Sequence, residues 1–221
     1  MKTSTSSNLH SLPKIIVICV AFVSGFCIMT IEMLGARIMS PYFGGSLPVW
    51  GSIITIFMLA LACGYLIGGR LSTRNPNPVT YALFFIAAAL SSLPIILFAD
   101  FIMEPIFLAV EDPRYGSLLA SIFLYFVPTC MLGMISPYSV RLLVDSEEHS
   151  GHMAGILFFV STIGSAAGTL GTSFYFVLWF EINQILWGSV FALICAGGFV
   201  LVANHLAQGM GLKSQVHQYG K

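Results

Sequence analysis

The stretch VWGSIITIFMLALACGYLIGG, residues 49–69, runs for 21 residues without a charged side chain. A helix that crosses a bilayer needs about 20 consecutive, mostly apolar residues, so this stretch predicts a transmembrane helix. The rest of the chain agrees, because 57% of its 221 residues are hydrophobic and only 8% are charged. A soluble domain could not cover that much apolar surface with polar groups. The sequence therefore predicts an integral membrane protein.

Five further apolar runs are long enough to span a bilayer. They cover residues 15–34, 79–99, 117–135, 153–174 and 182–203. The fold class that we expect is an all-α integral membrane protein with six transmembrane helices in one domain, residues 14–205. Residues 1–13, rich in Ser and Thr, are expected to form a disordered cytoplasmic tail, and residues 206–221 a second cytoplasmic tail.

Neither a metal nor a cofactor is expected. The five cysteines lie inside apolar runs and form no C-x-x-C pair, which is typical of small core residues. In DSEEHSGHM, residues 145–153, His149 and His152 lie among three acids. Such a group could bind a metal, but we favour a solvated loop that leads into the next helix. The balance of nine basic and nine acidic residues gives no indication of nucleic-acid binding.

Basic residues predict the orientation, because Lys and Arg in short loops are retained on the cytoplasmic side. If the N-terminus is inside, only Arg37 and Arg114 lie outside. The seven basic residues on the inner side are Lys2, Lys14, Arg70, Arg74, Arg141, Lys213 and Lys221. We therefore expect both termini to be cytoplasmic.

Glycines suggest an internal repeat and close helix packing. Gly64 and Gly68 recur as Gly164 and Gly168, and the shift corresponds to three helices. An odd number of helices makes the second copy run in the opposite sense, which gives the inverted 3+3 repeat common in secondary transporters. Small residues four apart also let helix backbones approach. We therefore expect the helices at 49–69 and 153–174 to pack together, either as plain packing or as a surface that slides during transport.

One acid lies close to the membrane interior. Glu32 lies near the end of the first apolar run, and an ionisable residue at that depth is costly enough to suggest a function. Arg37 would lie about 140° further around a regular helix, so the two cannot pair with each other. The expected partner of Arg37 is instead Glu181, Asp100 or Glu104, on other helices at the same outer level. The segment SPYFGGSLPVW, residues 40–50, is interpreted as an ordered re-entry turn.

These polar residues allow two interpretations that the sequence alone leaves open. The first is a structural network of ion pairs that fixes the helix ends. The second is an acidic, aromatic-rimmed outer pocket, which would attract an ammonium group through charge and cation–π interactions. The candidate substrate-binding residues are Glu32, Arg37, Tyr42, Trp50, Asp100, Glu104, Trp179 and Glu181.

Two long segments carry a family resemblance. SGFCIMTIEMLGARIMSPYFGGSLPVWGSIITIFMLALACGYLIGGRLS (24–72) and GILFFVSTIGSAAGTLGTSFYFVLWFEINQIL (155–186) resemble the N-terminal membrane domain of bacterial membrane-bound spermidine synthase-like proteins, also called fused major-facilitator/spermidine synthases. GYLIGGRLSTR, residues 64–74, is similar to the loop between helices two and three of major facilitator transporters, although the usual Asp is absent. The resemblance implies half of a major facilitator unit in a bacterial inner membrane.

The resemblance also implies a function in polyamine metabolism. In that family a soluble Rossmann-like domain performs the aminopropyl transfer, and here only residues 204–221 follow the last apolar run, which is too short for such a domain. Any aminopropyltransferase activity would thus need a separate catalytic protein. The chain is then expected to anchor or partner that protein and to bind or pass a small cationic amine. The alternative is an independent small transporter that acts as a homodimer.

Overall fold

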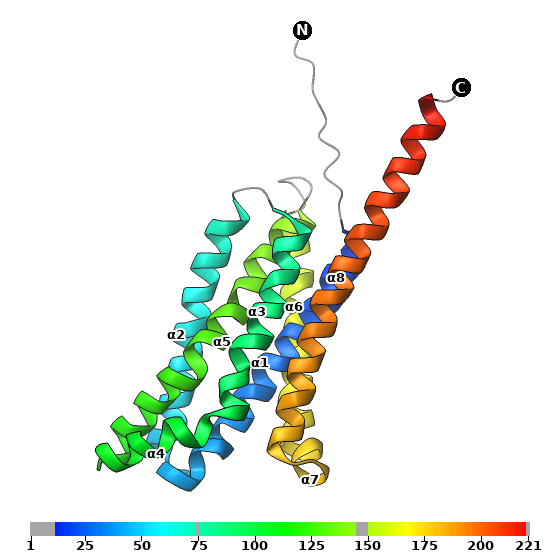
Figure 1. Ribbon diagram of the computed structural model, residues 1–221. Coiled ribbons are helices and arrows are strands. Elements are labelled where there is room, and N and C mark those ends of the chain that lie inside the picture. Colours follow the sequence, from blue (N-terminus) through cyan, green and yellow to red (C-terminus); the bar gives the residue numbers. More distant parts are fainter. Residues whose placement is uncertain (1–11, 74–75, 145–149, 220–221) are drawn as a thin grey trace.

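The computed structural model describes residues 12–73, 76–144 and 150–219, with side chains up to residue 208. Six helical segments within these ranges are long and apolar enough to cross a membrane, which confirms the predicted all-α fold with six spans. They alternate in direction along the bundle (Figure 1). The spans are α1 (Lys14–Phe43), α2 (Leu47–Ser72), α3 (Pro78–Leu97), α5 (Pro113–Leu143), the segment Ser150–Trp179 and α8 (Ile182–Tyr219).

The first helix continues well beyond its predicted end. It includes Pro41 and ends only at Phe43, so the expected re-entry turn at residues 40–50 is wrong. Proline removes one backbone hydrogen bond but does not exclude a helix whose other bonds are made. The turn is reduced to residues 44–46, where Gly44 ends the helix with a φ of 77°. Pro48 then lies in the first turn of α2, where its missing N–H leaves no bond unmade.

A short helix that the sequence did not predict connects the third and fourth spans. This helix is α4 (Ala99–Ala109), and its 11 residues contain Pro105. Only Met103 is buried, whereas Phe101 is 78% and Leu108 74% exposed. Too short to span a bilayer, α4 lies at the end of the bundle opposite the N-terminus (Figure 1).

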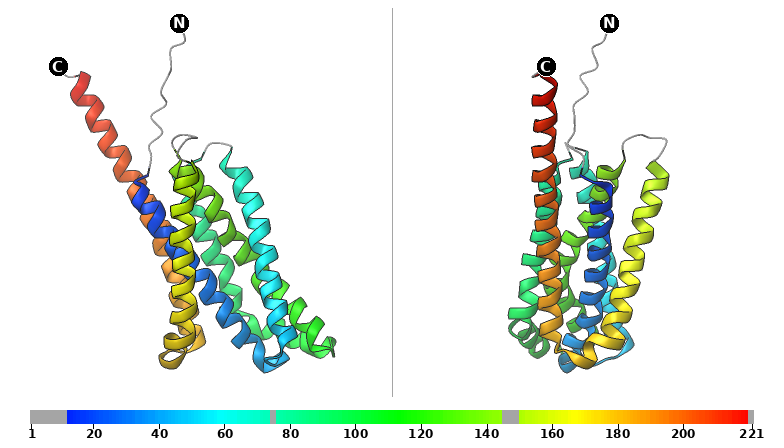
Figure 2. Two further views of the ribbon diagram at one scale, coloured as in Figure 1. Left: turned by 180° about the vertical axis from the view of Figure 1, so that it is seen from behind. Right: turned by 90° about the vertical axis from the view of Figure 1, so that its right-hand side faces the viewer.

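The fifth span changes its helical form near its end. It consists of α6 (Ser150–Gly171), a π-helical turn η2 (Thr172–Phe176) and the short α7 (Val177–Trp179). The last helix, α8, projects past the rest of the bundle on the side of the N-terminus in both views of Figure 2. Its helical backbone therefore includes most of the expected C-terminal tail. Of the expected N-terminal tail, residues 1–11 lie outside the described residues, and so do residues 145–149, for which a solvated loop was expected.

The glycine-rich helices pack closely, but not with each other as predicted. A Cβ atom built on Gly64 would lie 2.3 Å from the Cys130 carbonyl oxygen on α5. One built on Gly164 would lie 2.2 Å from the Phe22 carbonyl oxygen on α1. Thus α2 packs on α5 and α6 on α1, so the expected pairing of α2 with α6 is wrong. Small residues place backbones together, but they do not specify which neighbour approaches.

The helix pairs follow the two-fold pattern of an inverted repeat. The spans α1, α2 and α3 form the first triplet, and α5, α6 and α8 form the second. The second helix of each triplet packs on the first helix of the other, and the third helices, α3 and α8, pack on each other. The close contacts repeat as well: Gly68 meets Met134, four residues after Cys130, and Gly168 meets Phe26, four residues after Phe22. Each triplet thus completes its packing only with helices of the other triplet.

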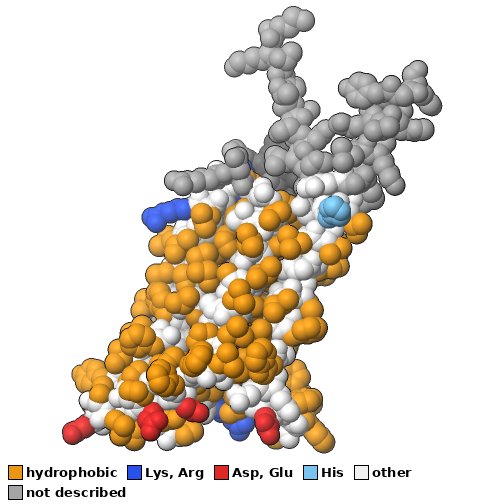
Figure 3. Space-filling model, in the orientation of Figure 1, with side chains coloured by type: hydrophobic (Ala, Val, Ile, Leu, Met, Phe, Trp, Pro, Cys, Tyr) orange, Lys and Arg blue, Asp and Glu red, His pale blue; other side chains and the backbone are white. Residues whose placement is uncertain are grey.

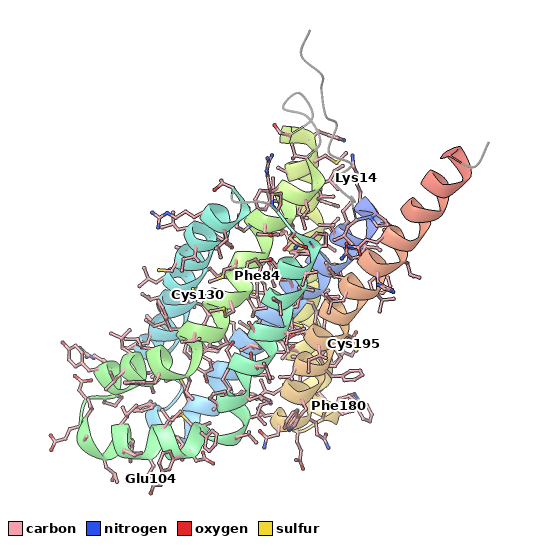
Figure 4. All side chains as sticks on the ribbon, turned by 45° about the horizontal axis from the view of Figure 1, so that its top comes forward. Lys14, Phe84, Glu104, Cys130, Phe180 and Cys195 are labelled. Atoms are coloured by element: carbon pink, nitrogen blue, oxygen red, sulfur yellow. The ribbon has the colours of Figure 1, made fainter. Side chains whose placement is uncertain are left out.

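The two ends of the bundle differ in charge. A broad apolar surface covers the face shown in Figure 3, and acidic side chains gather at the end where α4 lies. We call this end the acidic end. It carries Asp100, Glu104, Glu111, Asp112 and Glu181. Figure 4 shows Glu104 at this end, opposite Lys14.

Candidate functional site

A cavity of about 430 Å³ opens at the acidic end between α1, the α3–α4 junction and the beginning of α8. Three charged side chains line it, each from a different element: Arg37, Asp100 and Glu181. Its apolar lining includes Ile38 and Ile95. Volumes of this size hold small organic ligands, and a few polar groups on an apolar lining give such sites their specificity.

Local sequence explains how each charged residue reaches the cavity. Because α1 continues through Pro41, Arg37 stays on a regular helix, and Pro41 has no N–H to donate to the Arg37 carbonyl. Asp100 lies in the first turn of α4, which starts one residue earlier. Glu181 directly precedes α8, and its backbone N–H donates to Gln184 Oε1 at 3.2 Å. Two of the charges are thus placed by the beginning of a helix, and Arg37 is placed by the continuation of α1 to Phe43.

A tyrosine joins this site to a third carboxylate, that of Glu104. Tyr42 donates its hydroxyl hydrogen to Asp100 Oδ1 at 3.0 Å, which connects the last turn of α1 to α4. Glu104, one turn further along α4, also acts on this hydroxyl through its charge. Phe107 contacts the Tyr42 ring edge-on, with 6.1 Å between ring centroids. The Tyr42 side chain therefore has two carboxylates, Asp100 and Glu104, near its hydroxyl group and the Phe107 ring against its own ring.

The charges of the cavity are not neutralised by direct pairing. Among the described residues, Arg37 makes no ion pair within 4.0 Å, although Asp100 and Glu181 line the same cavity. The side chains of all three are exposed. The guanidinium and the Glu181 carboxylate therefore keep their hydrogen-bonding capacity for water or a ligand, and Asp100 keeps the part that its bond from Tyr42 does not use.

Comparison with protein-family models, curated proteins and solved structures finds no match to this chain. The functional argument therefore rests on the residues themselves.

Five of the eight candidate residues do not line this cavity. Tyr42 and Glu104 adjoin it beside Asp100, and the other three lie elsewhere. Glu32 is five residues before Arg37 on a regular helix, about 140° around it, and it does not line the cavity. Trp50 is in the first turn of α2 and half-buried. Trp179 ends α7 and is 79% exposed. The single aromatic-rimmed pocket expected from the sequence is thus divided among separate places.

The sequence analysis missed polar and apolar parts of the cavity. Asn183 lines it directly after Glu181 and Ile182, and Ile96 and Leu97 line it from the end of α3. A polar residue just inside the start of an apolar run was a usable signal for Asn183. No sequence signal marked Ile96 and Leu97, because α3 is apolar throughout and the sequence does not show which helices pack against it.

A second, smaller cavity lies between α1, η2 and α8. Its volume is about 290 Å³, and its lining includes Phe26, Phe176 and Ile185. Thr172 donates to Thr30 Oγ1 at 3.2 Å beside it, so the hydroxyl pair is satisfied within the protein. The π-helical turn contributes Phe176 to the lining, and no charged residue lines this cavity.

Proposed function

We propose that this chain is the membrane module of a polyamine-related system and binds a small cationic amine in the cavity at the acidic end. The observation that carries the proposal is the convergence of Asp100 on α4 and Glu181, directly before α8, with an Arg37 that pairs with neither. Two carboxylates against one guanidinium give the cavity a formal charge of about −1. An ammonium has three donors for these oxygens, and such charge-assisted bonds are short and strong.

The proposal includes an orientation. Both termini lie in the cytoplasm of a bacterial cell and the acidic end faces outward across the inner membrane, because basic residues are retained inside. Arg70 and Arg141 close α2 and α5 at the end opposite α4, which supports this orientation.

Cysteine labelling tests the orientation. In a background without the five native cysteines, Thr73→Cys should react with an impermeant maleimide only after cells are opened, and Gly45→Cys in intact cells. Both positions are exposed and lie at opposite ends of α2. Labelling of Thr73→Cys in intact cells would reverse the orientation.

A catalytic partner remains part of the proposal. The family resemblance supports a separate spermidine synthase-like protein, which this chain would anchor on the cytoplasmic side. The projection of α8 past the bundle at the end of Lys14 supports such a role, because it offers helical backbone beyond the spans (Figures 1 and 2).

Equilibrium binding of labelled spermidine and putrescine to the purified protein tests the ligand. Asp100→Asn and Glu181→Gln should each weaken binding by about 1.5–3 kcal/mol, the range for a hydrogen bond to a charged group. Arg37→Gln should strengthen it, because a repelling charge is removed. Glu111→Gln is the matched control, since this exposed carboxylate does not line the cavity. Equal affinity of Asp100→Asn and Glu111→Gln would refute the site, and weaker binding by Arg37→Gln would indicate a ligand with its own carboxylate.

A second candidate function is an independent transporter of half the major-facilitator size, acting as a homodimer. The two-fold pattern of helix pairs favours it, because inverted repeats are common in secondary transporters. Uptake of labelled amine into liposomes that contain only this protein would support it. Binding without uptake would favour the membrane-module function.

A further inference from the structure

One carboxyl group lies inside the bundle without a partner. The side chain of Glu32 is only 8% exposed. Within the described residues it forms neither a hydrogen bond nor an ion pair. A buried charge without compensation is very costly, so a carboxyl group in this setting is stable when it carries a proton.

An unpartnered hydroxyl group lies in the same part of the bundle. Across the described chain, only two fully enclosed side-chain oxygen or nitrogen atoms lack a hydrogen bond, Ser24 Oγ and Thr129 Oγ1. The carboxylate oxygens of Glu32 are not among them, so they keep a small accessible surface although the residue as a whole is buried. Thr129 is on α5 and is 1% exposed. Most buried polar atoms in proteins have a partner, so each exception calls for an explanation.

The register of α1 against α5 follows from two contacts. The Tyr125 hydroxyl donates to the Gly35 carbonyl oxygen at 3.3 Å. Ser121 Oγ donates to Met39 Sδ at 3.4 Å. The two helices run in opposite directions, so a step towards the start of α1 corresponds to an equal step towards the end of α5. The residue three before Gly35 is therefore level with the residue three after Tyr125.

This register places Glu32 at the same height in the bundle as Pro128, and Thr129 is one residue further along α5. On α5, Thr129 lies about 40° around from Tyr125, towards the side where Gly133 packs on α2. On α1, Glu32 is on the same side, between the face that meets Tyr125 and the face that meets α6. Both residues are within about one turn of the middle of their helices. The carboxyl and the hydroxyl group therefore share one side of the interface, deep in the membrane.

The surrounding helices bring no counter-charge to this level. Arg37 lies on another face of α1, and its side chain lines the cavity at the acidic end. The Tyr125 hydroxyl is bonded to Gly35. The other titratable groups with described side chains on these spans are Lys14, Cys19, Cys27 and Tyr42 on α1, Cys63 and Tyr65 on α2, Arg114, Tyr115, Cys130 and Tyr138 on α5, His152 on α6, Tyr175 on η2, and Cys195 and His205 on α8. Arg114 begins α5 at the acidic end. The described histidines and Arg70 and Arg141 lie towards the opposite end of the bundle.

We propose that Glu32 is a proton-binding site in the middle of the membrane, with Thr129 as its positioning residue. A threonine hydroxyl both donates and accepts, so it can bond to either form of the carboxyl group. It accepts from the protonated acid and donates to the carboxylate. On release the O–H bond of Glu32 breaks, the electron pair stays on the carboxylate, and the proton passes to water that enters when the helices separate. This site is distinct from the amine cavity and does not depend on it.

Carbodiimide labelling tests the proposal on the intact chain. N,N′-dicyclohexylcarbodiimide is apolar and adds to protonated carboxyl groups, which gives an acylurea of known added mass. Peptide mass spectrometry of the wild-type protein in liposomes should place this mass on Glu32. The label should decrease as the pH is raised. It should disappear in Glu32→Gln and persist in Glu111→Gln, whose exposed carboxylate lies at the acidic end. A wild-type protein that takes no label at Glu32 at any pH would overturn the proposal.

The role of Thr129 has its own readout. In Thr129→Val no hydroxyl group remains to donate to the carboxylate once it forms, so labelling of Glu32 should persist to higher pH, by about one pH unit. Thr129→Ser keeps the hydroxyl group and should restore the wild-type profile. A profile that is unchanged in Thr129→Val would remove Thr129 from the site. Labelling is measured only on variants that elute as monodisperse protein, and the wild-type result decides the main claim without any variant.

Discussion

Replacing Gly68 by alanine should force α2 away from α5. The new Cβ atom would lie 2.5 Å from the Met134 carbonyl oxygen and 2.6 Å from its Cα atom. Carbon–oxygen contacts in proteins are about 3.3–3.6 Å, so the backbones must separate by about 1 Å. Such a gap removes about a quarter to a half of the dispersion attraction across it. We expect a loss of about 1–3 kcal/mol of stability, as for other overpacked cores.

The adjacent residue provides the control. A Cβ atom on Gly69 meets nothing within 4 Å, so Gly69→Ala should be neutral or add about 0.5–1 kcal/mol, because alanine favours helix over glycine. Thermal unfolding in detergent, followed by tryptophan fluorescence, should separate the two variants by roughly 4–8 °C. Equal melting temperatures for Gly68→Ala and Gly69→Ala would refute the close packing of α2 on α5.

Three further changes test other contacts in the same assay. Gly168→Ala should destabilise by about 1–3 kcal/mol, because its Cβ would lie 2.4 Å from a carbonyl oxygen of α1, whereas Gly155→Ala, in open space on the same helix, should not. Tyr81→Phe should cost about 1 kcal/mol, since the buried Ser139 loses its 2.6 Å bond to that hydroxyl but keeps its own bond to the Ile135 carbonyl; no change would show that the bond contributes nothing. Thr172→Val should cost a similar amount by stranding its hydroxyl partner on α1, and a wild-type melting temperature would contradict this.

The sequence was sufficient for the spans but not for their neighbours. Six apolar runs predict six helices because bilayer thickness sets a minimum length. Gly64 and Gly164 mark faces where backbones touch, but periodicity indicates a face and not the helix that meets it. The helix α4 was missed because its 11 residues are too few for a span and contain Pro105. Pro41 had the opposite effect, since it suggested a turn where α1 continues.

The candidate site was predictable to a similar degree. Arg37, Asp100 and Glu181 were recognisable because charged residues in an apolar chain concentrate at helix ends, and they do meet at one cavity. Glu32 was recognisable as an acid at membrane depth, but its place depended on the register with α5. A contact such as that of Tyr125 with Gly35 joins residues 90 positions apart, and a single sequence contains no signal for it.

The exchange of partners between the two triplets has a consequence for biogenesis. The strongest packing partners of α1, α2 and α3 are α6, α5 and α8, all of which follow them in the chain. During synthesis the first three helices therefore enter the lipid with their glycine faces uncovered, and they have little to assemble on until the second half is inserted. The nascent half would be open in that interval to membrane proteases and to insertion factors that shield polar intramembrane residues. Conversely, two separately expressed halves, divided between α4 and α5 at residues 110–112, should find each other in the bilayer, because nearly all the packing that defines the bundle lies between them.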